Sequence, residues 1–523
     1  MLRNKKYVYG SNATMVPAHV HFGILMLEKF KLFKEEIALL DAYSGAEMSY
    51  GEMAQMSVDI ALSLSRIGVG KGDVICICSE KRMEFIPTMI GVLCIGATFT
   101  TADISCKNAS ILYRINMSRP RIIFCSSTVY KIHDETFKSV ATLKKIIVYG
   151  EKPLVGVTLF KDFLTEHAPL EDFLATPVNG WCDTALILYS SGTTGQPKAV
   201  PLTHLNYILC HQHGLCNSRF TKTMMLSTRE WYYTYGLNHT IGTLLVGATV
   251  VYTRDQITDY LQAIQDYKVS FIQVVPTTIR DLVNSNLKNY DVSSLICMMS
   301  TSTPIDADLV KTAKEKFPKL KQVSQMYGMT EAGCLCDDLN TPKGPKPGSV
   351  GCVNPGVVIK VVDIKTGEPV GPNETGEICF KTPSLMPGYL GDLSRNYLDG
   401  EGFFKSGDIG YYDEDLYFYI THRIKDIIKY KGATMSPNEI EAVLLQYPGV
   451  REACVVAIEH RQYGEVPAAA VIADDVTAEE LMTFVTEQLT SISMDGGIKF
   501  VDNLPKVEGV KLNRKAVKDL FDI

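Results

Sequence analysis

The stretch that decides the fold is Leu186-Ile187-Leu188-Tyr189-Ser190-Ser191-Gly192-Thr193-Thr194-Gly195-Gln196-Pro197-Lys198, an apolar strand followed by a polar turn. The turn carries side chains that suit phosphate, namely Ser190, Ser191, Gly192, Thr193, Thr194, Gly195 and Lys198. Glycines let backbone N–H groups approach phosphate oxygens closely, hydroxyls donate further hydrogen bonds, and a lysine adds a point charge. The stretch therefore predicts a phosphate-binding loop at the end of a buried strand.

The spacing of this loop differs from that of a Walker A motif, which has four residues between its first glycine and its Gly-Lys pair. Gly192 and Gly195 are three positions apart, and Pro197 rather than glycine precedes Lys198. A plain Ser/Thr turn between two strands is the alternative interpretation of the same residues.

Outward from this loop, short apolar strands alternate with amphipathic helices over most of the chain before Pro347. Strands are expected at 74–79, 122–126, 145–149, 186–190, 249–252, 271–275 and 296–300, and helices at, for example, 259–267 and 306–316. Such alternation is typical of layered α/β folds with largely parallel sheets. We therefore expect the α/β class, with a large N-terminal domain of layered α/β sheets.

The pattern changes after Pro347. Short strands at 357–363, 376–381 and 416–421 are separated by Gly/Pro/Asn turns, which favours a small antiparallel or barrel-like β unit. The end of the chain predicts a small α+β domain, with strands at 453–458 and 468–472 and helices that begin at the capping boxes 436–439 and 477–480. We place the boundary at the charged junction 423–426, which gives domains 1–423 and 424–523.

Length and charge exclude several classes of protein. At 523 residues the chain is too long for one core, and its 46% hydrophobic and 21% charged residues are ordinary for a soluble protein. A net charge of −6 without a long basic run argues against a nucleic-acid partner. No apolar stretch reaches the roughly 20 residues that span a bilayer. Since 1–10 lacks a secretory pattern and 520–523 is not Ser-Lys-Leu, we expect a cytoplasmic protein. We also expect a monomer.

The 14 cysteines are scattered, which predicts reduced thiols in the cytosol. On a helix, Cys210, His213 and Cys216 would fall within about a third of the circumference, so they could hold a metal. Zinc sites usually combine a CxxC-like pair with a distant second pair, so the alternative is a helix flank that merely contains these residues.

The loop at 186–198 resembles the pyrophosphate-binding loop of the adenylate-forming superfamily, which includes acyl-CoA synthetases, peptide-synthetase adenylation domains and beetle luciferases. The resemblance implies that the loop residues and Lys198 bind the phosphates of ATP. Further motifs follow in the family's order, and the resemblance spans nearly the whole chain. One departure is Ala199, where the family usually has glycine.

The segment Gln325-Met326-Tyr327-Gly328-Met329-Thr330-Glu331 resembles the family's second nucleotide motif. An aromatic ring can stack on adenine, a hydroxyl can bond a phosphate oxygen, and a carboxylate can hold Mg²⁺. The resemblance assigns these roles to Tyr327, Thr330 and Glu331 respectively. Taken alone, the run could equally be an ordinary strand end.

Further motifs surround the expected domain boundary. The run 406–410 resembles the ribose motif, in which Asp408 accepts hydrogen bonds from both ribose hydroxyls. Arg423 matches an arginine that contacts ribose or phosphate, and Lys425 matches the position about which the C-terminal domain rotates. The resemblance therefore implies a mobile lid domain, whose strand at Lys429 faces the site when CoA attacks.

The segment Leu504-Pro505-Lys506-Val507-Glu508-Gly509-Val510-Lys511 resembles the loop that carries the catalytic lysine. Lys511 follows Pro505 by six residues, as in the family, although Val510 stands where glycine is usual. The resemblance implies that Lys511, Lys198, Thr330 and Mg²⁺ on Glu331 stabilise the charge that develops when a carboxylate attacks the α-phosphorus of ATP.

Within the superfamily, 406–414, 427–432 and 499–502 look closest to beetle luciferases and luciferase-like CoA ligases. Three sites depart from the luciferase pattern, and we place them in the acid-binding pocket. Tyr232-Tyr233 replaces paired histidines, 301–304 replaces a glycine-rich wall, and Cys334 replaces a serine. The predicted pocket residues are Tyr233, Tyr235, Thr301, Ser302, Thr303 and Cys334, with core packing as the alternative for the tyrosines.

The resemblance therefore implies activation of a hydrophobic or aromatic carboxylic acid, luciferin included, with ATP and Mg²⁺ and then transfer to CoA. One alternative is a beetle-type luciferase, in which adenylated luciferin reacts with O₂ and emits light. The other is a degenerate, non-catalytic nucleotide-binding protein, suggested by the changes at Ala199, Val510 and 301–303.

Overall fold

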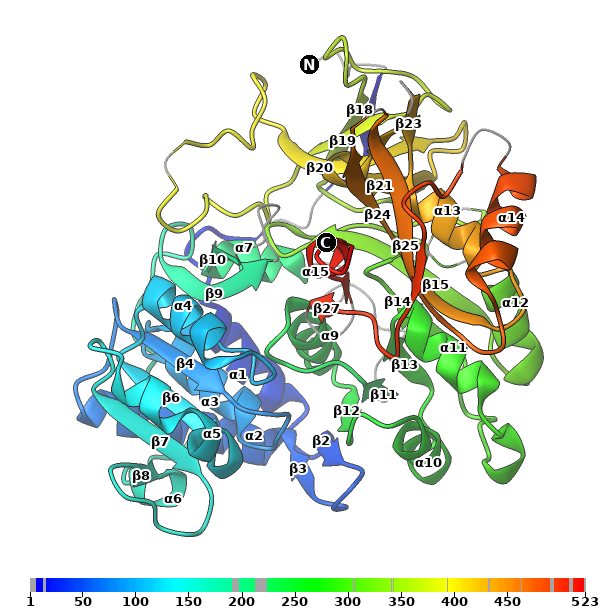
Figure 1. Cartoon of the computed structure of the whole chain (residues 1–523). Helices are drawn as coiled ribbons and strands as arrows, with labels where there is room; N and C mark the ends of the chain where they lie inside the picture. The colour runs from blue at the N-terminus through cyan, green and yellow to red at the C-terminus, as the bar shows by residue number, and fades with distance from the viewer. Residues whose placement is uncertain are drawn as a thin grey trace.

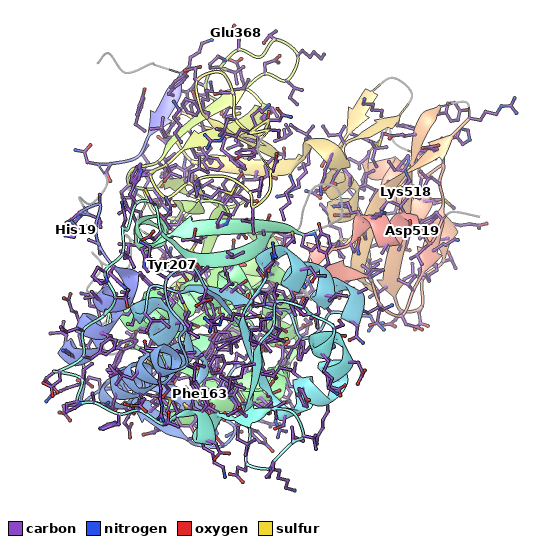
Figure 2. The ribbon with its side chains drawn as sticks, turned by 90° about the vertical axis from the view of Figure 1, so that its left-hand side faces the viewer. His19, Phe163, Tyr207, Glu368, Lys518 and Asp519 are labelled. Carbon is purple, nitrogen blue, oxygen red and sulfur yellow. The ribbon has the colours of Figure 1, made fainter. Side chains whose placement is uncertain are left out.

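The structure is a computed structural model that describes residues 6–12, 16–190, 197–211, 223–303, 305, 307–339, 341, 343–392, 394–430, 433–461, 463–489, 493–507 and 511–521. Within these ranges the strands form four sheets and one short hairpin. Figures 1 and 2 show the C-terminal elements, in orange to red, on one side of the N-terminal sheets. None of the described helices combines the length and apolar character that crossing a membrane requires.

The first sheet has seven strands in the order β10-β9-β5-β4-β6-β7-β8 and is parallel except for its β10–β9 edge. They are β4 (Val74–Cys78), β5 (Thr98–Thr101), β6 (Ile122–Ser126), β7 (Lys145–Tyr149), β8 (Thr158–Leu159), β9 (Thr184–Ser190) and β10 (Lys198–Thr203). The predicted strands 122–126 and 145–149 are confirmed residue for residue. Continuous apolar runs mark them because a parallel sheet is buried on both faces.

The second sheet has nine strands, parallel from β15 to β2 and antiparallel at both edges. In spatial order they are β17 (Cys352–Val353), β16 (Gly333–Asp337), β15 (Gln322–Met329), β14 (Cys297–Ser300), β13 (Phe271–Val274), β11 (Met224–Ser227), β12 (Thr249–Tyr252), β2 (Ile37–Asp41) and β3 (Glu47–Ser49). The expected layered, largely parallel α/β architecture is therefore confirmed.

Helices fill the space between these sheets and cover their outer faces. One core cluster runs from the first sheet to the second through α1 (Phe22–Leu32), α2 (Tyr50–Arg66), α3 (Phe85–Cys94), α7 (His204–Cys210) and α9 (Thr234–Leu245). A second cluster lies under α10 (Ile257–Tyr267), α11 (Pro276–Asn284) and α12 (Ala307–Lys316), and a third lies under α4 (Asn108–Ser118) and α5 (Ser127–Lys138). Two short helices are α6 (Phe160–Phe163) and the 3-10 helix η2 (Leu287–Asn289).

The third sheet is antiparallel, as the change of pattern after Pro347 predicts. Its strands are β1 (Tyr7–Tyr9), β18 (Val358–Val362), β19 (Gly376–Lys381), β20 (Phe404–Tyr412) and β21 (Phe418–Arg423). The sequence did not predict β1, which joins this sheet from the other end of the chain. Directly after β21 comes the 3-10 helix η3 (Ile424–Asp426).

The fourth sheet is built from residues that follow η3 (Figure 2). It contains β22 (Ile428–Tyr430), β23 (Ala433–Met435), β24 (Val450–His460), β25 (Gly464–Ala473) and β26 (Ile498–Phe500). One face packs on α13 (Pro437–Leu444) and α14 (Ala478–Gln488). The other packs on α15 (Arg514–Lys518) and the hairpin β27 (Lys506–Val507)–β28 (Lys511–Leu512).

Of the two predicted capping boxes, the one at α14 is confirmed and the one at α13 is wrong. At α14 the Thr477 hydroxyl accepts from the Glu480 N–H while the Glu480 carboxylate accepts from the Thr477 N–H, as predicted. At α13, Pro437 occupies the first turn, but the side chain of Ser436 makes no capping hydrogen bond. The N–H of Glu439 instead donates to the Ser436 carbonyl, so the backbone satisfies the group that the hydroxyl would have served.

Two histidines are buried where α1 meets α7. The rings of His21 and His204 lie 4.8 Å apart, and the Phe22 N–H donates to His204 Nδ1 at 3.2 Å. Burial lowers the pKa of His21 to about 4, and burial together with His21 lowers the pKa of His204 to about 3. Both rings are therefore neutral in the folded protein at neutral pH.

We expect His204→Gln to weaken the acid sensitivity of folding. Histidine titrates near 6.5 in the unfolded chain. As the pH falls from 6.5 towards 4, the two histidines therefore bind protons in the unfolded state but not in the folded state, which favours unfolding. Each ring then costs up to about 1.4 kcal/mol of unfolding free energy per pH unit. Urea unfolding at several pH values gives the slope of the unfolding free energy against pH, which reports the number of protons taken up on unfolding. That number should be about one lower in His204→Gln than in the wild type, and about two lower when His21→Gln is added. An unchanged slope would contradict this.

Candidate functional site

A buried carboxylate organises the centre of the candidate site. Asp408 on β20 is 4% exposed, and its Oδ2 accepts from the Tyr327 hydroxyl at 2.8 Å. Its Oδ1 lies 2.7 Å from Nε of Arg423 on β21. Burial alone would lower the pKa of Arg423, but Asp408 and Tyr327 raise it, so the guanidinium stays charged. The structure thus brings together three residues that the sequence assigned to nucleotide binding.

The backbone explains why these three residues meet. Asp408 and Arg423 are direct partners in the antiparallel β20–β21 pair. Tyr327 comes near the end of β15, where the strand turns into β16. Gly328 is needed there because a Cβ at this position would lie 2.3 Å from the Gly333 carbonyl oxygen.

A second group lies around Glu331, in the turn between β15 and β16. Its Oε1 accepts from the Tyr389 hydroxyl at 2.7 Å, and Glu331 is 7% exposed. Lys198 Nζ lies 4.6 Å from the centre of the Tyr389 ring. The ring therefore joins the lysine of the loop to the carboxylate, and positive and negative charge lie on either side of one aromatic side chain.

Thr330 connects this group to α9. Its hydroxyl oxygen lies 3.1 Å from that of Thr234, the first residue of the helix. Thr330 therefore connects the Glu331 turn to the segment that contains Tyr233 and Tyr235, which the sequence assigned to the acid pocket. The phosphate-binding and acid-binding predictions meet at this contact.

The phosphate loop lies between two neighbouring strands. Ser190, the last residue of β9, faces Lys198, the first residue of β10, across an antiparallel pair. The predictions for Ser191, Gly192, Thr193, Thr194 and Gly195 lie outside the described residues. Ala199 is 1% exposed inside β10, and its carbonyl accepts from the Leu390 N–H.

The predicted pocket residues divide into two places. The Tyr233 hydroxyl donates to Asp103 Oδ2 at 3.0 Å, beyond the end of β5. The Tyr235 hydroxyl donates to the Met299 carbonyl at 2.8 Å, which fixes it against β14 of the second sheet. Cys334 on β16 lies beside the Tyr327 carbonyl, with Sγ at 3.8 Å.

The wall predicted at 301–303 is held by hydrogen bonds rather than by glycines. The Thr301 hydroxyl donates to the Met326 carbonyl at 2.9 Å, and the Thr303 carbonyl accepts from Gln325. Ser302 is exposed and has φ of +84°, a left-handed conformation that glycine adopts without strain. The glycine-rich pattern that Thr301-Ser302-Thr303 replaces thus suits the left-handed backbone conformation found at Ser302.

The predicted lid residues lie on the C-terminal side. Lys425 is exposed on η3, and Lys429 is exposed on β22, where its N–H donates to Glu465 at 2.7 Å. Lys511 begins β28, paired through Val507 with β27. In the same hairpin, Lys506 pairs with Glu452, and both charges act on Asp281 of α11, whose pKa is raised mainly by burial. The hairpin therefore starts on the face that meets the N-terminal sheets.

The carboxylate of Glu331 suits a magnesium ion that also binds phosphate oxygens. Mg²⁺ is commonly held by one or two carboxylates together with phosphate oxygens and water. Glu331 supplies a carboxylate beside Thr330, while one of its oxygens already accepts from Tyr389. Among the described residues, no group of three His, Cys, Asp or Glu side chains could hold an ion alone. His213 and Cys216 of the weighed metal cluster lie outside the described residues.

Sequence reasoning missed three residues that the structure places in the site. Tyr389 contacts both Glu331 and Lys198, Thr234 contacts Thr330, and Asp103 accepts from Tyr233. Thr234 stands between Tyr233 and Tyr235, which the sequence placed in the acid pocket. For Tyr389 and Asp103 no local pattern exists, because their partners are distant in the chain.

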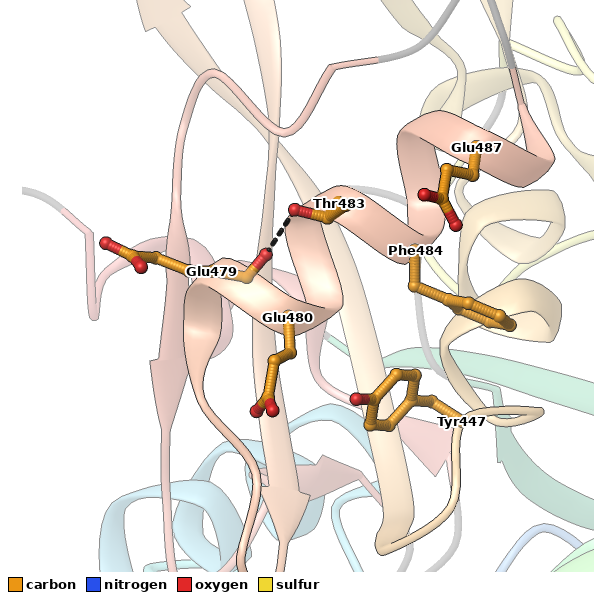
Figure 3. A pocket seen from close by; sticks show the side chains of 6 residues that line it. All are labelled: Tyr447, Glu479, Glu480, Thr483, Phe484 and Glu487. Carbon is orange, nitrogen blue, oxygen red and sulfur yellow. Dashed lines mark hydrogen bonds between the residues drawn. The ribbon is translucent and has the colours of Figure 1, made fainter.

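A separate shallow hollow lies on α14, away from these residues. It is lined by Tyr447, Glu479, Glu480, Thr483, Phe484 and Glu487 (Figure 3). The Thr483 hydroxyl donates to the Glu479 carbonyl within the helix. The three carboxylates belong to the solvated face of an amphipathic helix, so this hollow does not form part of the candidate site.

Comparison with known proteins identifies the family. Residues 28–390 match the AMP-binding enzymes, and residues 439–511 match the AMP-binding enzyme C-terminal domain. The chain is 32% identical over 513 residues to luciferin 4-monooxygenase of Photinus pyralis, covering 95% of this chain and 93% of that protein. It is 31% identical over 516 residues to 4-coumarate–CoA ligase of Pinus taeda, covering 96% and 95%.

A solved structure agrees with these relatives. The luciferase-like enzyme from the nonluminescent mealworm Zophobas morio is 29% identical, with a TM-score of 0.75 over 80% of this chain and 99% of that one. The family model covers more than half of the chain, and the motif resemblance is thereby confirmed. The chain belongs to the AMP-binding enzymes, the adenylate-forming superfamily, whose members activate acids with ATP.

Proposed function

We propose that this enzyme is an acid–CoA ligase. It converts a carboxylic acid and ATP into an acyl-adenylate and pyrophosphate, and then transfers the acyl group to CoA with release of AMP. The observation that carries the proposal is the group of Tyr327, Arg423 and the buried carboxylate of Asp408, with Thr330 and Glu331 in the turn that follows β15. That arrangement offers a ribose acceptor, a guanidinium, a hydroxyl and a carboxylate to one nucleotide.

In the first step, a carboxylate oxygen of the acid attacks the α-phosphorus and pyrophosphate leaves with the bonding electrons. Asp408 holds the ribose, since each of its oxygens can accept a second hydrogen bond. Thr330, Lys198 and Lys511 stabilise the charge on the phosphates. Glu331 would hold Mg²⁺, which adds positive charge at the same oxygens. The remaining groups position the reactants.

In the second step, the CoA sulfur attacks the acyl carbon and AMP leaves. We propose that residues 1–423 form the adenylating domain and 424–523 a lid that turns about Lys425 between the steps. The turn would withdraw Lys511 and bring Lys429 towards the site. The position of η3, directly after Arg423, supports a pivot next to the nucleotide.

A second candidate function rests on the identity to luciferin 4-monooxygenase. A luciferase would also form the adenylate, but would consume O₂ and emit light instead of forming a thioester. Tyr232-Tyr233, in place of paired histidines, supports the ligase proposal.

One experiment separates these functions. The enzyme is given ATP, Mg²⁺ and a panel of hydrophobic and aromatic acids, and pyrophosphate, acyl-CoA and light are measured in parallel. Pyrophosphate with CoA-dependent thioester supports the ligase. Strong light from D-luciferin without thioester would contradict the ligase and support the luciferase. If no acid releases pyrophosphate, both enzymatic functions are contradicted and a non-catalytic nucleotide-binding protein is the remaining alternative.

Asp408→Asn is expected to weaken ATP binding by about 10- to 100-fold, because hydrogen bonds to a charged acceptor contribute about 1.5–3 kcal/mol. The amide oxygen can still accept, but the charge opposite Arg423 is lost. Tyr327→Phe, which removes one hydrogen bond to Asp408, should cause a smaller loss. Titration with ATP measures both, and equal affinity in wild type and Asp408→Asn would contradict the assignment.

A further inference from the structure

One segment of the chain joins the two charged parts of the candidate site. It comprises residues 384–390, between β19 and β20, and backbone hydrogen bonds hold it at both ends. The Met386 N–H donates to the Glu331 carbonyl at 2.8 Å, and the Leu390 N–H donates to the Ala199 carbonyl at 3.0 Å. The segment, which we call the 384–390 bridge, therefore connects the turn after β15 to the start of β10.

Tyr389 is the residue of this bridge that reaches the charged groups themselves. Its hydroxyl donates to Glu331 Oε1 at 2.7 Å, and Lys198 Nζ lies 4.6 Å from the centre of its ring. The hydroxyl and the ring face are different parts of the side chain, so each charged group has a contact of its own. One tyrosine therefore contacts both a carboxylate that follows the second sheet and an ammonium that belongs to the first.

Aromatic packing holds the Tyr389 ring in place. The ring of Tyr397 lies edge-on against it at 5.1 Å, and the ring of Phe404 on β20 lies 5.4 Å from that of Tyr397. Gly388 allows this close approach, because a Cβ at that position would lie 2.9 Å from the Tyr397 hydroxyl oxygen. The ring is therefore fixed by the third sheet before any ligand binds.

The ring holds Lys198 without neutralising it. Within the described part of the chain, no carboxylate lies within ion-pair distance of Lys198. An aromatic face attracts a cation through its quadrupole and carries no net charge of its own. The ammonium therefore keeps its full charge for an anion, which a carboxylate partner in the same place would have cancelled.

Glu331 is held through one of its two carboxylate oxygens. Oε1 accepts from Tyr389, and the residue is 7% exposed. A carboxylate that is fixed by one oxygen presents the other in a set direction, and hydrogen-bonded partners of this kind strengthen the binding of metal ions. Direction is important for Mg²⁺, which requires nearly ideal octahedral geometry. Tyr389 thus leaves Oε2 as the oxygen available to a cation.

We propose that Tyr389 is a positioning residue for the triphosphate end of ATP, acting through Glu331 on the metal ion and through Lys198 on the phosphates. The inference rests on the proposed activation of an acid with ATP and deepens it. Because the hydroxyl serves Glu331 and the ring serves Lys198, the two actions can be separated. Tyr389→Phe removes only the first, and Tyr389→Leu removes both.

The test measures binding rather than turnover. Calorimetry gives the affinity of the full-length protein for α,β-methylene-ATP, which cannot release pyrophosphate, in saturating Mg²⁺ and in EDTA. Tyr389→Phe should lower the gain in affinity due to Mg²⁺ about 10-fold and change the affinity in EDTA less than about twofold, as expected for an outer partner of a metal ligand. Tyr389→Leu should also lower the affinity in EDTA by about 2- to 5-fold, because Lys198 loses the ring.

Tyr7→Phe is the matched control, because the Tyr7 hydroxyl donates to Glu401 at 2.7 Å outside the candidate site. It should keep both affinities. An unchanged gain from Mg²⁺ in Tyr389→Phe, an equal loss of affinity with and without Mg²⁺, or a wild type whose affinity does not rise with Mg²⁺ would overturn the inference. The expected binding pattern in a protein that forms no thioester would instead overturn the proposed ligase and leave this inference standing.

Discussion

Lys511→Ala should lower the rate of adenylate formation by about 10²- to 10³-fold and leave thioester formation from a supplied acyl-adenylate nearly unchanged. The physical reason is that a fixed charge at the α-phosphate contributes about 3–4 kcal/mol to the barrier of the first step only. In the proposed second step the lid has turned and Lys511 is withdrawn from the phosphate, so removing this lysine changes that step little. The asymmetry between the two steps is the diagnostic result.

The measurement follows each half-reaction separately, with pyrophosphate release for the first and acyl-CoA from synthetic acyl-adenylate for the second. Lys515→Ala is the matched control, since Lys515 is an exposed lysine on the adjoining α15. It should leave both rates within about twofold, as surface substitutions usually do. A Lys511→Ala enzyme that loses both half-reactions equally would remove Lys511 from the catalytic role.

Arg514→Ala should lower the unfolding free energy of the C-terminal domain by about 3–5 kcal/mol, the usual effect of removing one partner from a buried ion pair. The guanidinium donates to both carboxylate oxygens of Glu441 and, at 2.8 Å, to Asn438 Oδ1. It also lies 3.5 Å from Asp426 of η3. Burial alone would lower its pKa, but Glu441 and Asp426 raise it. Without Arg514, Glu441 keeps a buried charge with no cation.

Urea unfolding of the full chain, followed by a probe placed in the C-terminal domain, tests this expectation. Arg451→Ala is the matched control, because Arg451 pairs with Asp474 at 3.1 Å on the surface, where both side chains are more than half exposed. Exposed pairs contribute about 0–1 kcal/mol. If the two variants lose similar stability, the Arg514 network is not the buried pair that its geometry indicates. Glu441→Gln should reproduce most of the Arg514→Ala effect.

Much of the fold could be read from local pattern. The continuous apolar runs of β6 and β7 are visible in the sequence because each residue faces a covered side of a parallel sheet. Thr477 and Glu480 marked the start of α14 correctly, whereas Ser436 did not cap α13. A capping-box sequence shows which side-chain hydrogen bonds can form at the start of a helix. At α13 the N–H of Glu439 donates to the Ser436 carbonyl instead of to the Ser436 hydroxyl.

The site could be predicted only in part, because its contacts join distant segments. Motif order gave Tyr327, Asp408 and Arg423, and the structure brings these three into hydrogen-bond distance. Nothing local indicates that Tyr389 lies between Lys198 and Glu331, or that Arg514 lies beside Asp426. Such pairs follow from how sheets and loops pack, which a single sequence does not state.

The core clusters show where this chain can be divided. One cluster passes from the first sheet to the second through the helices between them and reaches the third sheet, so these three sheets share one continuous part of the interior. Within the described residues, the clusters on the two faces of the fourth sheet share no residue with that interior. We propose on this ground that the residues after η3 fold as a unit of their own. If so, a graft at this point would exchange the C-terminal domain of one family member for that of another without opening the main core.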